Sequence, residues 1–515
     1  MRNILFVSSE YYPFIKTGGL GDAVASLFRA VRISGDSAAI LLPGYKSLTD
    51  NVVEVIEEYG ISIPFSVVIK ARLKRVLLRN HSTPVWLLDC HQFFHQPGGI
   101  YDELEGQDGH LNTLRFAMLA WTASQLACGE ITDWVADIVH CHDWHTALVP
   151  AFIKKTMAGK DDRARPSTLL TIHNLAFQGH CRGEYLNILG LDEMVSKIGP
   201  ESWKGSFSFL ELGIIHADRV STVSPTYAKE ILSEELGCGL HQILACCPHG
   251  VSGILNGVDY NIWHAQTDKA LALNDYEFDG AARLRTKMVL QRELALKQSP
   301  KTAMLSFTNR LTHQKMADVF DELIPMLMKR DVQIVAMGEG QSEYVEAFEY
   351  AAQSYPDQFA YLGKFSEEME HRIHAGADIC LSPSRFEPCG LNPLYAMCYG
   401  SIPVVRATGG LCDTIVHATR SAIDNGTANG VVFATADEEG LKDGIWQALE
   451  LFEDRVQWSK LQKNAMNSSF LWQRAAKEYR DIYTDISQRK LAKDYNISVF
   501  QKPEIPFAPL LNVVG

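Results

Sequence analysis

Residues 16–22 carry the sequence Lys-Thr-Gly-Gly-Leu-Gly-Asp, which follows a short apolar run at residues 4–7 and precedes a helical pattern. This order predicts a glycine-rich turn between a strand and a helix, with Lys16 at its mouth, and such a turn suits a phosphate or a sugar. A second stretch, Ser-Arg-Phe-Glu-Pro-Cys-Gly-Leu at residues 384–391, follows another apolar run. It places Arg385 and Glu387 at the equivalent edge of a second sheet. Together the two stretches predict two sheet domains that face one cleft.

The same alternation of short apolar runs and helical patterns recurs along the whole chain. The runs lie at residues 4–7, 38–42, 136–139, 167–172 and 219–223 in the first half, and at 303–307, 332–337, 359–362, 377–381 and 402–405 in the second. Continuous apolarity is typical of strands that are buried on both faces of a parallel sheet. The sequence therefore predicts an α/β protein with doubly wound sheets.

Two segments depart from this pattern and divide the chain. Residues 61–70 and 85–88 are typical of antiparallel strands, which predicts a hairpin insertion over residues 61–89. Between residues 256 and 300 the pattern loses its strands and becomes polar and helical. We therefore place a domain boundary at about residue 263, with one domain over residues 1–262 and a second over residues 263–471.

Size, charge and cysteine content narrow the class of protein. The chain has 515 residues and a net charge of 48 − 61 = −13, which argues against nucleic acid and anionic membranes as partners. A neutral or polymeric substrate fits this surface better. No apolar run reaches the roughly 18 residues of a membrane span, the N-terminus shows no targeting segment, and the 11 cysteines are scattered. We therefore expect a cytoplasmic protein with free thiols.

Residues 308–315 place two cations, Arg310 and Lys315, just after a predicted strand. Fixed cations of this kind can stabilise a departing diphosphate without a metal. The alternative is a solvated basic loop. The turn at Lys16 has a similar alternative, a plain tight turn without a ligand.

Three further stretches leave their chemistry open. Residues 140–145 read His-Cys-His-Asp-Trp-His, which suggests a metal, but no further spaced ligands accompany the run, and a loop that binds sugar hydroxyls is the preferred hypothesis. His173 and Asn174 follow a buried strand, where a purely structural histidine is the alternative. Glu387 suits acid–base work, a bridge to a sugar hydroxyl or a helix N-terminal charge. A lone carboxylate does not define a glycosidase.

Eight ordered motifs together resemble one family. They are Lys-Thr-Gly-Gly-Leu-Gly-Asp at 16–22, His-Asp-Trp-His at 142–145, His-Asn-Leu-Ala-Phe-Gln-Gly at 173–179, Val-Ser-Pro-Thr-Tyr-Ala at 223–228, Leu-Asn-Gly-Val-Asp at 255–259, Arg-Leu-Thr-His-Gln-Lys at 310–315, Ser-Arg-Phe-Glu-Pro-Cys-Gly-Leu at 384–391 and Thr-Gly-Gly-Leu-Cys-Asp at 408–413. The chain resembles bacterial glycogen synthases and plant starch synthases, which are retaining glucosyltransferases. The resemblance implies the GT-B fold, in which two Rossmann-like domains face an interdomain cleft. It also implies a helix at residues 472–486 that crosses back to the first domain, and it does not place the tail at residues 487–515.

The resemblance implies transfer of glucose from ADP-glucose to the non-reducing end of an α-1,4-glucan such as glycogen or a maltooligosaccharide, with no metal and no cofactor. By the family's pattern, the residues that carry the chemistry are Lys16, His173, Arg310, Lys315 and Glu387. Those that bind the substrates are Gly18, Gly19, Asp22, Asp143, His145, Asn174, Asn256, Phe365, Cys389, Gly390, Leu391, Thr408, Gly409 and Gly410. In this pattern Lys16 meets the donor phosphate, Arg310 and Lys315 neutralise the diphosphate, His173 lies beside the anomeric carbon, and Glu387 holds the sugar.

Departures from the family pattern keep other functions in consideration. Met316 stands where glycine is usual, Asn309 where serine is common and Pro393 where glutamine is common. One alternative is the same reaction with UDP-glucose, and another is a relative that binds glucan with degenerate catalysis. A third is a related enzyme that makes a sucrose-like or trehalose-like disaccharide, against which the turn at residues 16–20 argues. The resemblance does not fix the oligomeric state.

Overall fold

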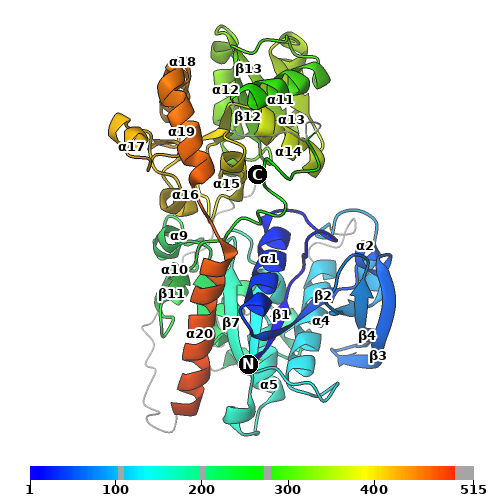
Figure 1. Ribbon diagram of the computed structural model, residues 1–515. Helices are drawn as coiled ribbons and strands as arrows, with labels where there is room; N and C mark the ends of the chain where they lie inside the picture. The colour runs from blue at the N-terminus through cyan, green and yellow to red at the C-terminus, as the bar shows by residue number, and fades with distance from the viewer. Residues whose placement is uncertain (103–109, 197–204, 272–279, 493–515) are drawn as a thin grey trace.

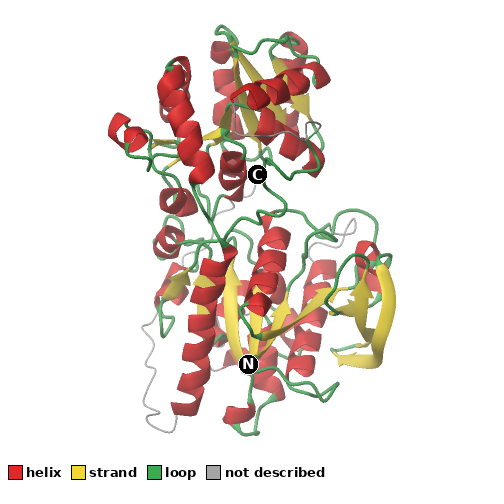
Figure 2. Ribbon diagram, in the orientation of Figure 1, coloured by secondary structure: helices red, strands yellow, loops and turns green. Residues whose placement is uncertain are grey.

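The computed structural model describes residues 1–102, 110–196, 205–271 and 280–492 (Figure 1). These residues form two domains, one built around each of two large sheets, and the chain passes between the domains twice. Helices cover both faces of each sheet (Figure 2), so the parallel strands are buried on both sides. The α/β class and the doubly wound sheets predicted from the apolar runs are confirmed.

The N-terminal domain contains a nine-stranded sheet in the order β11-β10-β7-β6-β1-β2-β5-β4-β3. Neighbouring strands from β11 to β5 are parallel, whereas β4 is antiparallel to both β5 and β3. The strands are β1 (Asn3–Val7), β2 (Ser37–Pro43), β3 (Val52–Pro64), β4 (Val68–Leu78), β5 (Val85–Asp89), β6 (Ile138–His142), β7 (Ser167–Ile172), β10 (Arg219–Thr222) and β11 (Val251–Gly253). A separate two-stranded ribbon pairs β8 (His180–Arg182) with β9 (Ser206–Ser208).

The helices of this domain connect successive strands. They are α1 (Gly19–Ile33), α2 (Lys46–Thr49), α3 (His91–Phe94), α4 (His110–Ala127), α5 (Val149–Thr156), α6 (Tyr185–Ile188), α7 (Asp192–Ser196), α8 (Phe209–His216), α9 (Pro225–Glu230) and α10 (His241–Ala245), with short 3₁₀ turns at Trp144–Thr146 and Asp162–Ala164. The first helix, α1, begins inside the glycine turn, as its sequence predicts.

The antiparallel insertion differs from its prediction in extent. The structure breaks the expected strand over residues 61–70 at a turn, so that β3 and β4 form a hairpin from Val52 to Leu78. The last segment of the predicted insertion is β5, which is antiparallel to β4, as expected, and parallel to β2, so the hairpin extends the nine-stranded sheet. The first half of β3 was not predicted, because it is an exposed edge strand with several glutamates and its sequence does not alternate between apolar and polar residues.

The C-terminal domain contains a six-stranded parallel sheet in the order β14-β13-β12-β15-β16-β17. The strands are β12 (Ala303–Thr308), β13 (Val332–Met337), β14 (Phe359–Leu362), β15 (Ile379–Ser382), β16 (Ile402–Arg406) and β17 (Val431–Phe433). The helices are α11 (Gly280–Glu293), α12 (Ala317–Leu327), α13 (Ser342–Ser354), α14 (Glu367–Gly376), α15 (Leu391–Cys398), α16 (Gly409–Thr414), α17 (Arg420–Asp424), α18 (Glu438–Glu453) and α19 (Arg455–Asn467), with a 3₁₀ turn at His313–Lys315.

Two segments cross between the domains side by side. The Val258 N–H donates to the Phe470 carbonyl oxygen at 2.7 Å, and Val258 pairs with Leu471 as an isolated parallel bridge. After this crossing α20 (Trp472–Ala492) runs along the N-terminal domain next to β7 (Figure 1). The helix extends beyond the expected residue 486, and residues 493–515 of the expected tail lie outside the described residues.

Candidate active site

A buried carboxylate, that of Glu10, is hydrogen-bonded to the backbone of the glycine turn at the start of α1. One oxygen of Glu10 accepts hydrogen bonds from the backbone N–H groups of Thr17 at 2.8 Å and Gly18 at 3.3 Å, and the other accepts from the Tyr101 hydroxyl at 2.6 Å. Burial raises the pKa of Glu10, although these three hydrogen bonds oppose the shift. The turn is thus fixed in place, with Gly18 and Gly19 exposed above it.

Lys16 lies between carboxylates of the two domains. Its Nζ is 2.9 Å from Asp22 Oδ2 in α1 and 3.6 Å from Glu367 Oε2 at the start of α14. The Tyr12 hydroxyl donates to the other oxygen of Glu367 at 2.7 Å. Burial alone would lower the pKa of Lys16, but Asp22 and its acidic neighbours raise it, so the side chain is a cation. This group joins the two domains at the mouth of the glycine turn.

His173 is held through its backbone and its ring. Asp143, whose backbone lies in the left-handed region at φ 58°, accepts hydrogen bonds from the N–H groups of His173 at 2.6 Å and Asn174 at 3.3 Å. The His173 Nε2 lies 3.0 Å from His142 Nδ1. Burial lowers the pKa of His173 to about 3, so the ring is neutral near pH 7. His173 and Asn174 remain partly exposed, whereas Asp143 is buried and its carboxylate accepts the two backbone hydrogen bonds.

The other aromatic residues of the 140–145 run pack inside the domain. The His145 ring is stacked on Tyr101, with the two centroids 4.6 Å apart, and meets Phe116 edge-on at 4.7 Å. Trp144 meets Phe116 edge-on at 4.9 Å, and its ring lies so close to Gly179 that a Cβ there would collide with it at 2.1 Å. Both rings therefore pack behind the site, and His145 is 95% buried.

In the C-terminal domain, Arg310 and Lys315 follow β12 and have different surroundings. Arg310 is exposed, and its guanidinium lies 5.7 Å from the centre of the Phe177 ring in the N-terminal domain. Within the described part of the chain it has no ion-pair partner. Lys315 instead forms a direct ion pair with Glu387, which also accepts a hydrogen bond from the Ser384 hydroxyl at 3.0 Å.

The loop that carries Glu387 is tied to its neighbours by backbone contacts. The Gly410 N–H donates to the Glu387 carbonyl at 3.0 Å, and a Cβ on Gly409 would lie only 1.9 Å from that oxygen, so only glycine fits there. Cys389 is hydrogen-bonded to Asn256 from the interdomain crossing. The turn at residues 408–410 and Asn256 therefore both contact the loop that carries Glu387, at the backbone of Glu387 and at Cys389.

The two halves of the site meet across the interdomain cleft. A Cβ on Gly19 would lie 3.0 Å from a methyl group of Leu391, closer than an ordinary van der Waals contact. Deeper in the molecule, Glu230 of α9 accepts a hydrogen bond from the Gly409 N–H at 2.9 Å and another from the Thr408 hydroxyl at 3.4 Å. A carboxylate of the N-terminal domain thus engages the glycine turn that the sequence analysis assigned to substrate.

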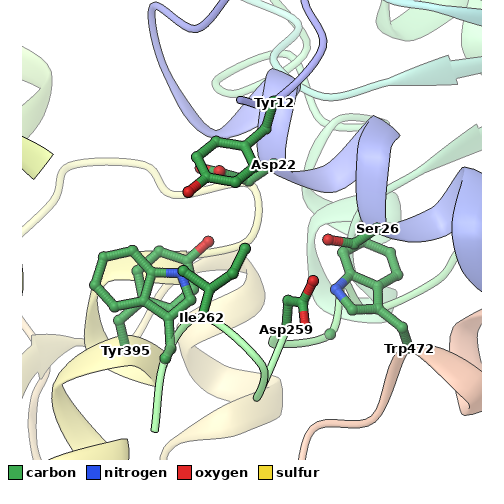
Figure 3. A pocket seen from close by; sticks show the side chains of 9 residues that line it. Tyr12, Asp22, Ser26, Asp259, Ile262, Tyr395 and Trp472 are labelled. Carbon is green, nitrogen blue, oxygen red and sulfur yellow. The ribbon is translucent and has the colours of Figure 1, made fainter. Parts of the chain in front are cut away.

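A small pocket lies where the crossing segments pass between the domains. Figure 3 shows Tyr12 and Asp22 on one side of it and Tyr395 from α15 on the other. Asp259 also lines the pocket and accepts a hydrogen bond from Arg29 at 2.5 Å. Asp22 therefore lines this pocket and also forms the ion pair with Lys16.

Comparison with known proteins places the chain in a family. Residues 3–245 match the family model of the starch synthase catalytic domain, and residues 292–465 match that of glycosyl transferases group 1. The glycogen synthase of Aromatoleum aromaticum is 39% identical over 489 residues, which cover 93% of this chain and 96% of the relative. That of Paramagnetospirillum magneticum is 36% identical over 489 residues, 94% of this chain and 97% of the relative. The chain belongs to the glycogen synthase family.

Solved structures agree with this membership. The catalytic domain of starch synthase IV from Arabidopsis thaliana, bound to ADP and acarbose, matches with a TM-score of 0.84 and 29% identity over 95% of this chain and 100% of that domain. Sucrose-phosphate synthase from Thermosynechococcus elongatus matches with a TM-score of 0.56 at 14% identity, which shows a shared fold. The protein is a glycosyltransferase with the GT-B fold, as its motifs predict.

Two carboxylates at the site of this glycogen synthase family member, Glu10 and Glu367, were not among the residues expected from the sequence. Glu10 follows β1 in the stretch Ser-Ser-Glu, and a buried acid directly after a strand was the available signal. Glu367 begins α14 after Ser366, whose side chain caps the helix by accepting from the Met369 N–H, and this capping pattern gave no hint of a partner. Phe365, which was expected to contact the substrate, is half-exposed, with its ring centre 5.7 Å from Lys16 Nζ.

The metal alternative for residues 140–145 finds no support in the described ranges. His140 is hydrogen-bonded to Tyr483 of α20 at 2.8 Å and to Thr171 at 2.7 Å. Across residues 1–102, 110–196, 205–271 and 280–492, no group of three or more His, Cys, Asp or Glu side chains is placed to hold a metal ion. None of the helices in those ranges is long and apolar enough to span a membrane.

Proposed function

We propose that this glycosyltransferase transfers glucose from ADP-glucose to the non-reducing end of an α-1,4-glucan, with retention of the anomeric configuration. The acceptor is glycogen or a maltooligosaccharide. Support comes from relatives named glycogen synthase over nearly the whole chain and from a starch synthase domain of the same fold with bound ADP. UDP-glucose is the second candidate donor.

The observation that carries the proposal is the placement of three cations at one interdomain cleft. Lys16 stands at the glycine turn of the N-terminal domain, while Arg310 and Lys315 stand beyond β12 of the C-terminal domain. A nucleoside diphosphate sugar is a compact dianion, which needs such a local cluster in a protein of net charge −13. The uncommitted Arg310 suits the diphosphate best.

In this proposal the cations act on the leaving group. Negative charge develops on the diphosphate as the bond from the sugar to the phosphate breaks, and preorganised cations stabilise that charge. Arg310 supplies a planar fork that fits two phosphate oxygens, and Lys315 supplies a point charge held by Glu387. Lys16 adds a third charge from the opposite domain, so that donor binding draws the two domains together.

Glu387 and His173 are assigned to the sugar. Glu387 is 93% buried and accepts from both Lys315 and Ser384, which suits a carboxylate that orients hydroxyl groups more than one that attacks carbon. His173 is neutral and partly exposed, so it offers a hydrogen-bonding nitrogen to the glucosyl group. Because Arg310 and Lys315 neutralise the diphosphate, we propose a reaction that requires no metal.

In the deciding experiment, the purified protein is incubated with glycogen and either ADP-glucose or UDP-glucose, and release of the nucleoside diphosphate is measured. We expect nucleoside diphosphate release with ADP-glucose, and incorporated glucose that β-amylase removes as maltose, because that enzyme attacks α-1,4 links at the non-reducing end. Release with UDP-glucose alone would transfer the proposal to that donor.

No release with either donor would refute the transferase proposal. Binding of glycogen without binding of a nucleotide sugar, measured by calorimetry, would favour the degenerate glucan-binding alternative. A product formed from free fructose or glucose as acceptor would favour a disaccharide synthase.

A further inference from the structure

His142 is a buried histidine that has no role in the proposed function. It ends β6, and its ring is fully enclosed in the N-terminal domain. The ring packs against Phe6, with centroids 5.6 Å apart and planes 19° apart, and against His140, at 4.1 Å and 36°, and these two rings are themselves 5.1 Å apart. His140 is in turn fixed by its hydrogen bonds to Tyr483 and Thr171. The His142 ring is therefore held in a cluster of three mutually contacting rings, which restricts its orientation.

The two nitrogens of His142 have different surroundings. Its Nδ1 lies 3.0 Å from His173 Nε2, whereas its Nε2 is buried and finds no hydrogen-bond partner among the residues that the structure describes. A neutral imidazole carries one N–H and one lone pair. A buried N–H group without a partner is rarer in proteins than a buried acceptor without one. The proton of His142 therefore belongs on Nδ1, where it has an acceptor.

This assignment fixes the neighbouring ring as well. If His142 Nδ1–H donates, His173 Nε2 must accept, and the proton of the neutral His173 ring must sit on Nδ1. Burial lowers the pKa of both rings, His142 well below its usual value and His173 to about 3, so neither is doubly protonated near pH 7. The His173 ring is only partly buried, and in the described ranges its Nδ1 has no protein partner.

We propose that His142 is a positioning residue for His173: by donating from Nδ1 to His173 Nε2, it holds His173 in the tautomer that presents an Nδ1–H donor to the sugar in the cleft. The proposal rests on the proposed glucosyl transfer for its functional meaning. With the opposite tautomer, His173 would present a lone pair instead, and a sugar oxygen placed there as an acceptor would meet a second acceptor.

Asp143 and His142 hold different parts of His173, the backbone and the ring. Asp143 fixes the backbone N–H of His173 at 2.6 Å and thus the position of the Cα atom. It does not contact the ring, so it leaves the tautomer undetermined. His142 supplies the one hydrogen bond to the ring that the structure records.

The test reads the tautomer directly in the full-length protein without substrate. Histidine labelled with ¹⁵N is incorporated, and the His173 ring signals are identified by their loss in His173→Asn. A protonated ring nitrogen and a bare one resonate in separate regions of the ¹⁵N spectrum. We expect Nδ1 of His173 to be protonated and Nε2 to be bare. The reverse pattern in the wild-type protein would overturn the proposal and needs no variant of His142.

Two substitutions of His142 extend the test to catalysis. His142→Asn keeps an N–H donor near the position of Nδ1, whereas His142→Leu keeps the bulk but removes the donor. We expect His142→Leu to give a mixture of His173 tautomers and to lower kcat/KM for the donor about tenfold, the effect of losing one hydrogen bond. His142→Asn should restore the single tautomer and most of the activity.

The outcomes separate this inference from the proposed function. A wild-type protein that transfers no glucose refutes the proposed function, while the ¹⁵N spectrum still decides the tautomer. A His142→Leu protein that folds, as judged by its melting temperature, and keeps both one His173 tautomer and full kcat/KM would overturn the inference alone.

Discussion

Replacing Arg310 by alanine should separate catalysis from stability unusually well. Arg310 is exposed, and its recorded side-chain contact is the Phe177 ring at 5.7 Å, worth about 0.5–1 kcal/mol at an exposed site. Its loss strands no buried counter-ion, unlike loss of Lys315, which would leave the buried Glu387 unpaired. We therefore expect the free energy of unfolding to fall by no more than about 1 kcal/mol.

The effect of Arg310→Ala on turnover should be far larger. Loss of one preorganised charge at a developing anion typically slows catalysis by about 100-fold or more, or about 2.7 kcal/mol. The fall should appear in kcat, because Lys16 and Lys315 still bind the donor in the ground state. Arg310→Lys should recover only part of the rate, since an ammonium group lacks the bidentate fork.

The assay is steady-state ADP release with ADP-glucose and glycogen, run beside thermal unfolding. Arg330→Ala is a matched control, because Arg330 is also exposed and lies 4.4 Å from the Trp446 ring. Arg330 is in the same domain but precedes β13, whereas Arg310 follows the parallel neighbour β12, so the two residues lie at opposite ends of the strands. The control should lose similar stability and keep its kcat. A folded Arg310→Ala protein with near-normal kcat would refute the diphosphate role and leave a solvated basic loop.

Four further outcomes are expected. Activity should survive EDTA, and complete loss that magnesium or manganese restores would contradict the metal-free proposal. Small-angle scattering should show a smaller radius of gyration with ADP plus a maltooligosaccharide, and an unchanged profile would count against domain closure. Met316 is buried and its backbone lies in the left-handed region at φ 56°, so the Met316→Gly protein should unfold no more easily than Met316→Ala, which retains about 1–2 kcal/mol of left-handed strain. As a control, Ala351→Gly inside α13 should lower the free energy of unfolding by about 1 kcal/mol. If glycine is less stable than alanine at both positions, the backbone of Met316 is not strained. Burial raises the pKa of Glu370 to about 7, partly opposed by Lys16, so between about pH 4.5 and 7 the folded protein holds a proton that the unfolded chain releases, and stability is lost as the pH rises through that window. Glu370→Gln should therefore raise the melting temperature at pH 8, through a gain of up to ~3 kcal/mol in the free energy of unfolding, but not at pH 4. An equal gain at pH 4 would contradict the assignment.

The strands could be predicted because burial on both faces leaves a continuous apolar signature. All ten expected runs are strands, although β6 and β15 each begin two residues later than expected. Four strands that were missed, β8, β9, β11 and β17, have three residues each, too few to show any period. The local sequence therefore predicts where the buried strands lie, but it does not show which strands pair at the edges of a sheet.

For the site, position was predictable and pairing was not. The strand ends placed Lys16, His173 and Arg310 at the sheet edges that face the cleft, because ligands lie beyond the carboxyl ends of parallel strands. The ion pair between Lys315 and Glu387 joins residues 72 positions apart, and no local pattern encodes such a contact. The burial of His145 depends likewise on rings from other elements.

The path of α20 has a consequence for how the protein is made. Its residues Ala475, Ala476, Tyr479 and Tyr483 complete the apolar core of the N-terminal domain beside α1 and β7, so the first domain to leave the ribosome is the last to be finished. Domains usually fold as they emerge, but here the groove for α20 stays open while all of the C-terminal domain is being translated. We expect ribosome-bound chains halted before residue 472 to be cut readily by protease within the N-terminal domain. The core of the N-terminal domain is therefore completed only after the C-terminal domain has been translated.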